Sequence, residues 1–287
     1  MKVLVLGGGQ IARAVGAGAP GQHQVIARTH KELDIVDETA VLRTLSEIKA
    51  DWIVNAAAFT AVDLAEEQPG QAHAVNAAAV GFLARASAQE GRRLLHLSTD
   101  FVFDGNTNRA YLPTDKPMPL SIYGASKLAG EHHVLDAGAA GIVLRTSWVY
   151  AAIGKNFVLT MLRLMREKDG ISVVVDQIGT PTWAASAAAA IWGLIETAAK
   201  GGIYHWADLG VASWYDFAIA IQDEALARGL LPRAIPIAPI STAAYPTRAR
   251  RPAFSVLDTA STRASIDVPA QHWRHNLRAM LDELRTA

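Results

Sequence analysis

The first half of the chain alternates short apolar runs with longer stretches in which apolar residues recur at helical spacing. Apolar runs of four or five residues predict buried strands, and the amphipathic stretches between them predict helices. The predicted strands are 3–6, 24–27, 52–55, 93–97 and 142–145, and the predicted helices are 10–18, 39–49, 69–90 and 123–135. Repeated strand–helix–strand units with nearly continuous apolar strands are typical of α/β proteins. We therefore expect an α/β fold built on a Rossmann-like, doubly wound parallel sheet.

The second half is less regular. It contains predicted helices at 156–168, 182–199, 213–228 and 270–285, predicted strands at 171–175 and 203–206, and a proline-rich stretch over 231–252. The regular alternation of predicted strands and helices ends near Tyr150, which predicts a dinucleotide-binding domain over residues 1–150. Residues 151–287 are expected to form mainly a smaller substrate-binding lobe, with some segments returning to the first domain.

Composition narrows the function without deciding it. Of 287 residues, 51% are hydrophobic and 19% are charged, as in an ordinary globular enzyme. Lys+Arg and Asp+Glu are both 27, which gives no support for binding nucleic acid or a membrane surface. The absence of cysteine excludes disulfides, thiolate metal sites and cysteine nucleophiles. The most apolar long window, 183–200, is rich in alanine and contains Glu196, so it predicts a packed helix, and we expect a cytoplasmic protein.

A glycine cluster follows the first predicted strand. Gly7, Gly9 and Ala12 satisfy the pattern G-x-G-x-x-G/A, and Gln10 and Ile11 open the next helix. Glycines at these positions permit a tight turn and let a pyrophosphate approach the helix N-terminus. The loop therefore predicts a dinucleotide site, whereas the alternative is a glycine-rich turn without a ligand.

The end of the second strand bears on the choice of cofactor. An acidic residue there would hold the ribose 2′-hydroxyl, but the chain has Arg28, which is suited to a 2′-phosphate. This favours NADPH and leaves NADH as an alternative, since Arg28 is also explained as a solvated loop charge. Asp34 lies where it would receive the adenine end of the cofactor, or it serves as a turn or helix-capping residue.

Tyr123 and Lys127 carry the candidate chemistry. Four residues apart on a predicted helix, they share one face, and an ammonium beside a phenol lowers the Tyr pKa from its usual value of about 10. A phenol tuned in this way delivers a proton to a carbonyl oxygen near neutral pH. Alone the spacing is weak, but Thr99 at the end of the strand 93–97 places a hydroxyl at the edge of the sheet where ligands bind.

Together Thr99, Tyr123 and Lys127 resemble the Ser/Thr-Tyr-Lys set of the extended short-chain dehydrogenase/reductases. Further segments narrow the resemblance to the dTDP-4-dehydrorhamnose reductase family. They are 55–63 with Glu66, 75–76, 98–100, 145–150, 156–157, 176–177, 179–182 and 251–252. The resemblance runs over nearly the whole chain and implies NAD(P)H-dependent reduction at C4 of a dTDP-linked 4-keto-6-deoxy sugar.

The resemblance also implies roles for individual residues. Tyr123 would be the general acid, Lys127 would hold the nicotinamide ribose and bias Tyr123, and Thr99 would orient the carbonyl. Trp148 would form an apolar wall against the deoxysugar, or it is plain core packing. The cofactor is expected to contact Gly7, Gly9, Gln10, Ile11, Arg28, Asp34, Ala56, Ala57, Ala58, Asn76, Tyr123 and Lys127. The nucleotide sugar is expected to contact Thr60, Val62, Thr99, Phe101, Trp148, Asn156, Arg250 and Arg251.

The chain departs from the family pattern at several positions. Ala12 stands where a third glycine is usual, and Phe101 stands where tyrosine is common, which removes a hydroxyl from the sugar side. Related dehydratases carry a glutamate at the position of Phe101, so reduction is favoured over water elimination. Some relatives use magnesium at a dimer contact, but the sequence has no acidic cluster that predicts a metal site.

Arg248, Arg250 and Arg251 cluster just before Pro252 in the second half. Guanidinium groups suit the geometry of a diphosphate, so the cluster is a candidate grip for the nucleotide sugar. The alternative is a solvated basic face.

Two other functions remain open. One keeps the fold and the triad but changes the sugar or the base, and the other is a non-catalytic regulatory subunit, as in the methionine adenosyltransferase β subunit. The intact triad argues against the second, because a module that only binds has no chemical need for all three residues. The sequence fixes neither the hexose nor the oligomeric state, although the resemblance allows a homodimer.

Overall fold

A parallel sheet forms the centre of the larger lobe in the computed structural model, which describes residues 1–138 and 140–286. Its strands are β1 (Lys2–Leu6), β2 (Gln24–Arg28), β3 (Trp52–Asn55), β4 (Arg93–Thr99), β5 (Ile142–Thr146) and β10 (Gly202–His205), in the order β10-β5-β4-β3-β1-β2. All neighbouring strands in this sheet pair in parallel. The doubly wound parallel sheet expected from the sequence is confirmed. The strand order reverses between β1 and β3, and ligands bind at such switch points.

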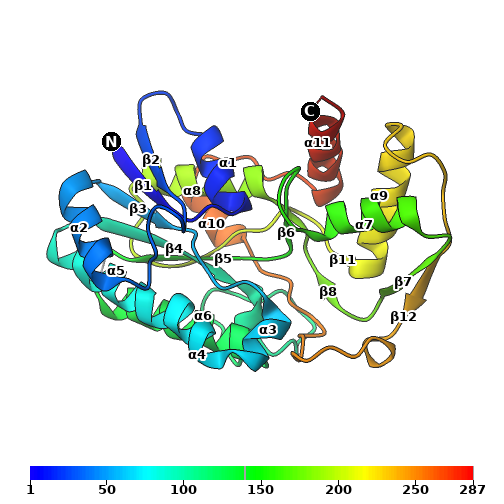
Figure 1. The fold of residues 1–287 in the computed structure, drawn as a ribbon, viewed down its shortest axis with the longest axis horizontal. Coiled ribbons are helices and arrows are strands. Elements are labelled where there is room, and N and C mark those ends of the chain that lie inside the picture. The colour runs from blue at the N-terminus through cyan, green and yellow to red at the C-terminus, as the bar shows by residue number, and fades with distance from the viewer. Residues whose placement is uncertain (139, 287) are drawn as a thin grey trace.

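Helices cover both faces of the sheet (Figure 1). On one face α1 (Gln10–Ala17) and α8 (Ala184–Glu196) pack on alternate strand residues such as Val3 and Val54. On the other face α2 (Glu38–Ile48), α5 (Ala79–Gln89) and α6 (Ile122–Asp136) pack on the intervening residues, such as Leu4 and Ile53. Because side chains alternate across a strand, every strand interior must be apolar on both faces, which explains the continuous apolar runs.

The predicted helix 69–90 is divided in the structure. After α3 (Val62–Glu67), it consists of α4 (Pro69–His73), the π-helical turn η1 (Ala74–Ala78) and α5. π-Helical turns are frequent at functional sites because they redirect one side chain without ending the helix. Here the turn brings Asn76 beneath the loop that follows β3.

A second core forms the smaller lobe. It is built from α7 (Phe157–Glu167), α9 (Trp214–Ala227) and α11 (Trp273–Thr286), which lie together at the right of Figure 1. Short strands join these helices: β6 (Val149–Tyr150), β7 (Ile171–Val174), β8 (Ile178–Gly179), β9 (Thr182–Trp183), β11 (Ala212–Ser213) and β12 (Ile237–Ile240). Buried aromatic rings, including Tyr150 and Phe217, fill the space between the helices.

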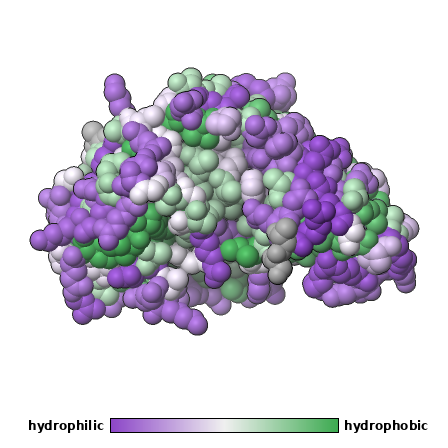
Figure 2. Space-filling model, turned by 90° about the horizontal axis from the view of Figure 1, so that it is seen from above, coloured by the Kyte–Doolittle hydropathy of each residue, from purple (hydrophilic) through white to green (hydrophobic). Residues whose placement is uncertain are grey.

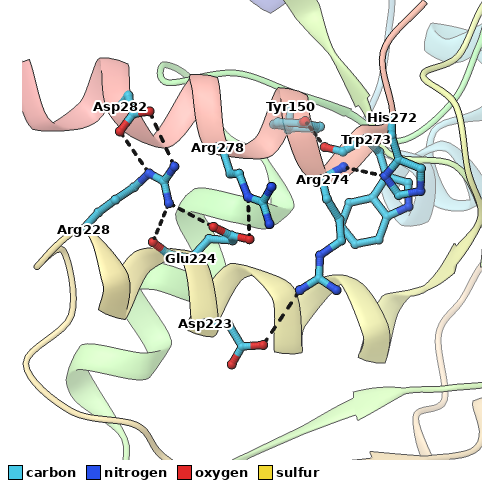
Figure 3. Close-up of polar contacts among 9 residues, drawn as sticks. All are labelled: Tyr150, Asp223, Glu224, Arg228, His272, Trp273, Arg274, Arg278 and Asp282. Carbon is cyan, nitrogen blue, oxygen red and sulfur yellow. Dashed lines mark hydrogen bonds and ion pairs between the residues drawn. The ribbon is translucent and has the colours of Figure 1, made fainter.

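Ion pairs link the outer ends of α9 and α11 (Figure 3). Glu224 on α9 accepts from Arg228, at 3.0 Å, and from Arg278 on α11, at 2.8 Å. Arg228 also pairs with Asp282 at 3.0 Å. Glu224 and Arg228 are largely shielded from solvent, whereas their partners on α11, Arg278 and Asp282, are about half exposed, so the bonds between the two helices are partly screened.

The chain contributes to both cores beyond residue 150. After β9 it returns to the first lobe as α8 and β10, and it returns there again as α10 (Ala260–Ser265). The predicted helix 182–199 is therefore β9 followed by α8. The proline-rich stretch 231–252 contains β12, which pairs in parallel with β7, and the 3₁₀ turn η3 (Thr242–Ala244).

Hydrophilic side chains cover much of the face seen from above, with paler, weakly hydrophobic residues between the two ends of the molecule (Figure 2). Within the described residues, none of the helices combines the length and the apolar character needed to cross a bilayer.

Candidate active site

A cavity of about 450 Å³ lies at the carboxyl ends of the central strands, against the second lobe. Most of the side chains that the sequence predicts for the site line it together. Its walls are Gly9, Gln10, Ile11, Ala56, Ala58, Thr60, Val62, Leu97, Ser98, Thr99, Asp100, Phe101, Tyr123, Lys127, Thr146, Ser147, Trp148, Val149, Lys155, Trp214 and Arg251. Gly7, Arg28, Asp34, Ala57, Asn76, Asn156 and Arg250 lie outside this lining.

The glycine loop has the shape of a phosphate cradle. Gly7 has φ +116°, and a Cβ there would lie 2.9 Å from the Ala56 carbonyl carbon, so glycine allows the loops after β1 and β3 to touch. Gly9 is the N-cap of α1 and supplies no side-chain cap, which leaves the first N–H groups of the helix for a ligand. Nothing lies within 4 Å of a Cβ built on Gly9. These features fit a dinucleotide pyrophosphate.

The end of β2 lies beside this loop. The Gly7 N–H donates to the Arg28 carbonyl oxygen at 2.8 Å, and the half-buried Arg28 guanidinium donates to the Ala27 carbonyl at 3.0 Å. Asp34 is exposed and accepts from the Val36 N–H at 3.1 Å. It is thus a turn residue in this structure, while Asp37 caps α2.

Asn76 lies outside the lining of the cavity, and its predicted contact with the cofactor stays a prediction. It is fully buried, and its carboxamide accepts from the Phe59 N–H at 2.8 Å and donates to the Phe59 carbonyl at 3.0 Å. It also donates to Ser126 Oγ at 3.0 Å. Asn76 therefore fixes the loop that follows β3 against α6.

Close packing of α6 on the turn after β4 brings Tyr123 to Thr99. Ser121 caps α6 by accepting from the Gly124 N–H at 3.2 Å, and a Cβ on Gly124 would lie 2.2 Å from the Phe101 carbonyl oxygen. Only glycine permits that approach. The ring of Phe101, in the 3₁₀ turn η2 (Asp100–Val102), lies edge-on to Tyr123 with centroids 5.7 Å apart.

The expected low pKa of Tyr123 is wrong for this arrangement. Burial raises the Tyr123 pKa to about 12, against a smaller lowering by the Thr99 hydroxyl. The reason is the direction of Lys127, whose Nζ contacts His96 Nε2 at 3.1 Å and the Leu97 carbonyl oxygen. Burial lowers the pKa of Lys127 to about 8, so this side chain gains or loses its positive charge close to neutral pH.

Asp100 is a site residue that the sequence reasoning missed. It is 2% exposed and lines the cavity, and burial raises its pKa to about 6. Its Oδ1 accepts from the Thr99 hydroxyl at 3.1 Å, while its Oδ2 has no hydrogen-bond partner among the described residues. Its place directly after Thr99 at a strand end was the available signal.

Two tryptophans form the wall on the side of the second lobe. Trp148 has φ +44° and stacks on Trp214 of α9, with ring centroids 3.5 Å apart and planes 5° apart. A Cβ on Gly179 would lie 2.5 Å from the Trp148 ring, so glycine makes room for it. Trp214 and the exposed Lys155 were missed from the sequence, because they reach the cavity only through the tertiary packing of the second lobe.

The three candidate arginines lie in different surroundings in the structure. Arg251 lines the cavity, and its Nη2 donates to Asp63 Oδ2 at 2.8 Å, whereas Arg250 is exposed outside the lining. Arg248 pairs with Glu67 on the surface. Asn156 caps α7 and donates to Gln10 Oε1 at 2.9 Å, so it joins the second lobe to the glycine loop rather than lining the cavity.

Comparison with known proteins agrees with this geometry. The family described as RmlD substrate binding domain matches residues 1–286. A dTDP-4-dehydrorhamnose reductase from Aggregatibacter actinomycetemcomitans is 40% identical over 285 residues, which is 96% of this chain and 97% of the relative. A second, from Burkholderia thailandensis, is 41% identical over 96% of each chain.

This chain belongs to the dTDP-4-dehydrorhamnose reductase family. A solved dTDP-4-dehydrorhamnose reductase from Bacillus anthracis, in complex with NADP, superposes with a TM-score of 0.93 at 34% identity. The match covers 98% of this chain and 99% of that one. The resemblance stated from the sequence is thus confirmed at the level of the family.

Over the described residues, no group of three or more His, Cys, Asp and Glu side chains is arranged to hold a metal ion.

Proposed function

We propose that the protein reduces the 4-keto group of dTDP-4-dehydro-6-deoxy-L-mannose, using NADPH, and so produces dTDP-L-rhamnose. The observation that carries this proposal is the meeting of Thr99, Tyr123 and Lys127 with the glycine loop in one cavity. A binding-only protein has no need of that combination. Family membership supports the choice of substrate, and the NADP complex of the Bacillus anthracis relative supports the choice of cofactor.

The residues present fit a nicotinamide dinucleotide. When bound, that cofactor supplies the hydride, and the protein supplies position and charge. The N-terminus of α1 and the Gly7–Gly9 turn would hold the pyrophosphate, and the apolar Ala56–Ala58 loop admits close approach. Arg28, at the end of β2 beside the loop, would pair with the 2′-phosphate of NADPH.

Tyr123 acts as the general acid. With a pKa of about 12 it keeps its proton at neutral pH, so the phenol is ready to donate to the C4 oxygen as the hydride reaches C4. Thr99 would hold the same oxygen by a second hydrogen bond. The phenolate that remains on Tyr123 needs a nearby cation, and Lys127 one helical turn away provides it when protonated.

The side of the second lobe fits the nucleotide sugar. The Trp148–Trp214 stack offers an apolar surface to the deoxysugar, and Arg251 with Lys155 offers positive charge to the diphosphate. Asp100 lines the same cavity beside Thr99, so we expect its carboxyl group to influence binding of the sugar. A homodimer and a cytoplasmic location are further expectations from the family.

One set of assays tests the identity of the substrate and the role of Tyr123 separately. Purified protein is incubated with NADPH and a panel of nucleotide 4-keto-6-deoxy sugars, and the absorbance of the reduced cofactor is followed. We expect turnover with the dTDP-linked 4-keto sugar, and Tyr123→Phe should lower kcat by about 10²–10⁴-fold with little change in the Kd for NADPH. Wild-type turnover by Tyr123→Phe would remove Tyr123 from the role of acid, and preference for another sugar in the panel would change the substrate.

A further inference from the structure

A chain of buried polar groups runs behind Lys127 and ends at the loop after β3. The Ala57 N–H donates to Asn55 Oδ1 at 3.2 Å, and Asn55 Nδ2 contacts His96 Nδ1 at 3.1 Å. His96 Nε2 contacts Lys127 Nζ at 3.1 Å, and Nζ also donates to the Leu97 carbonyl. Asn55 and His96 are fully buried, and Lys127 is 2% exposed. Neither Asn55 nor His96 lines the cavity, so the proposed mechanism does not use them.

The direction of each hydrogen bond follows from one fixed donor. A backbone N–H can only donate, so the Ala57 contact sets the carboxamide of Asn55 with its oxygen toward Ala57 and its NH₂ toward His96. His96 Nδ1 must then accept. In a neutral imidazole the other nitrogen carries the hydrogen, so Nε2–H points at Lys127 Nζ. Only an uncharged amine has a lone pair to receive it.

The surroundings agree with a neutral ring at His96. Burial lowers the His96 pKa well below its usual value, so the ring is neutral. The other charged or titratable groups around Lys127 come from its own helix, from the strands and from the turn after β4. They are Tyr123 and Glu131 on α6, Asp100 on η2, and Arg145 on β5, whose guanidinium is bonded to Glu131. Glu131 favours the cation, but two bonds to Arg145 and one to Ser98 already engage its carboxylate.

We propose that Asn55 and His96 are positioning residues for Lys127, and that they favour its uncharged amine and so set the pH at which this side chain gains its charge. The inference rests on the proposed function only in giving Lys127 a catalytic role. As an amine, Lys127 docks on His96. As a cation, Lys127 has no lone pair with which to accept from the His96 Nε2–H, so it is released toward Tyr123. Its positive charge is needed there once the phenol has lost its proton.

The same chain links Lys127 to the loop that borders the cavity. For His96 to accept from a cation, its ring must carry the hydrogen on Nδ1, and the Asn55 carboxamide must turn over. That rotation would break the bond to the Ala57 N–H. The charge on Lys127 and the order of the Ala56–Ala58 loop are therefore coupled. Because turning the Asn55 carboxamide would cost the bond to the Ala57 N–H, a charged Lys127 leaves His96 rather than forcing the His96 ring and Asn55 to rearrange.

The ionisation of Lys127 is measured directly by NMR of protein carrying ¹³C-labelled lysine, without cofactor or substrate, with Lys127→Met used to assign the resonance. We expect wild-type Lys127 to titrate near 8, well below the usual lysine pKa of about 10.4. His96→Gln offers a carbonyl that accepts from an ammonium, and should raise the midpoint by about one unit or more. Asn55→Asp accepts from His96 Nδ1–H, turns the ring to the other tautomer and should shift the midpoint in the same direction.

Ser87→Ala is the control, since it removes a buried hydrogen bond on α5, from the Ser87 hydroxyl to the Leu83 carbonyl oxygen, that involves neither Lys127 nor the chain of polar groups behind it. Its Lys127 titration should coincide with that of the wild type. A wild-type Lys127 that titrates together with the surface lysines would overturn the proposal, and this result needs no variant to fold. Unchanged midpoints in both His96→Gln and Asn55→Asp would overturn it equally.

Enzyme kinetics supply the second readout. The pH profile of kcat/KM reports groups of the free enzyme, so its alkaline limb should move upward in His96→Gln and Asn55→Asp by the shift seen in the NMR titration. A merely structural role would lower activity without moving the limb. If the wild type turned over none of the sugars, the proposed function would fail, while the NMR titration would still decide the role of Asn55 and His96.

Discussion

Replacing Asp100 by Asn should make stability relative to wild type more favourable above pH 6 than at lower pH, while harming substrate binding. The carboxyl is 2% exposed, and its Oδ2 has no hydrogen-bond partner in the described structure. Burial disfavours the charged form, which is why the pKa rises. Asparagine has nearly the same shape, keeps an oxygen for the Thr99 hydroxyl and carries no charge.

The size of the effect follows from the pKa shift. The value rises from 3.8 to about 6, which is about two units, and each unit is about 1.4 kcal/mol of differential interaction. The carboxylate therefore costs the folded state about 3 kcal/mol at pH 8. The unpartnered NH₂ of Asn has its own cost, about 1–3 kcal/mol, but that cost is the same at every pH.

The sign of the pH dependence is fixed. Because the folded-state pKa is raised, the folded wild type binds more protons than the unfolded chain between pH 3.8 and about 6. Its stability therefore falls as pH rises through that window. Below the window both side chains are neutral, and above it only the wild type carries the buried charge.

Urea unfolding of both proteins at pH 4.5 and pH 8 tests this reasoning. The stability of Asp100→Asn relative to wild type should be about 2 kcal/mol more favourable at pH 8 than at pH 4.5, because part of the penalty is already present at pH 4.5. Asp136→Asn, on the exposed face of α6, controls for the loss of one charge. An equal difference at the two pH values would refute a buried, desolvated carboxylate. In activity assays, Asp100→Asn should raise KM for the nucleotide sugar and leave the Kd for NADPH unchanged.

Three further substitutions test other parts of the site. Arg28→Ala should weaken NADPH by about 1.5–3 kcal/mol in a binding titration and leave NADH nearly unaffected; equal losses for both would make Arg28 a bystander. Arg251→Ala should raise KM for the nucleotide sugar, less so at high salt, with the Kd for NADPH unchanged; a loss confined to NADPH would place Arg251 elsewhere. Gly124→Ala should force α6 away from the Phe101 carbonyl and lower both kcat and the melting temperature; wild-type kcat would show that the close packing of α6 does not position Tyr123.

The sequence patterns predicted the larger lobe well because its signals are local. Strands such as Val3–Leu6 are buried on both faces and read as continuous apolar runs, and the glycine loop follows the first strand directly. The junction of Thr99 with Tyr123 could also be anticipated, because parallel strands end at one edge of the sheet. Element ends were less accurate, since the helix 69–90 contains a π-turn that no composition signal marks.

Tertiary contacts explain what the sequence did not reveal. The pKa of Tyr123 depends on where the Lys127 side chain points, and in this structure its Nζ contacts His96, which is 31 residues away in the chain. Trp214 enters the site only because α9 packs behind Trp148. The arginine cluster reads as one feature in sequence, yet neighbouring residues on an extended segment face different ways, so Arg251 reaches the cavity and Arg250 does not.

The repeated return of the chain to the first lobe has a consequence for engineering sugar specificity. Because α8 and β10 complete the sheet and its helical cover, a fragment ending near residue 150 would lack an edge strand and bare the apolar face beneath α8. The second lobe is likewise stitched from several separate stretches. A chimera that borrows the second lobe of a relative must therefore be spliced at several junctions at once, and a single-crossover library would yield mostly insoluble hybrids.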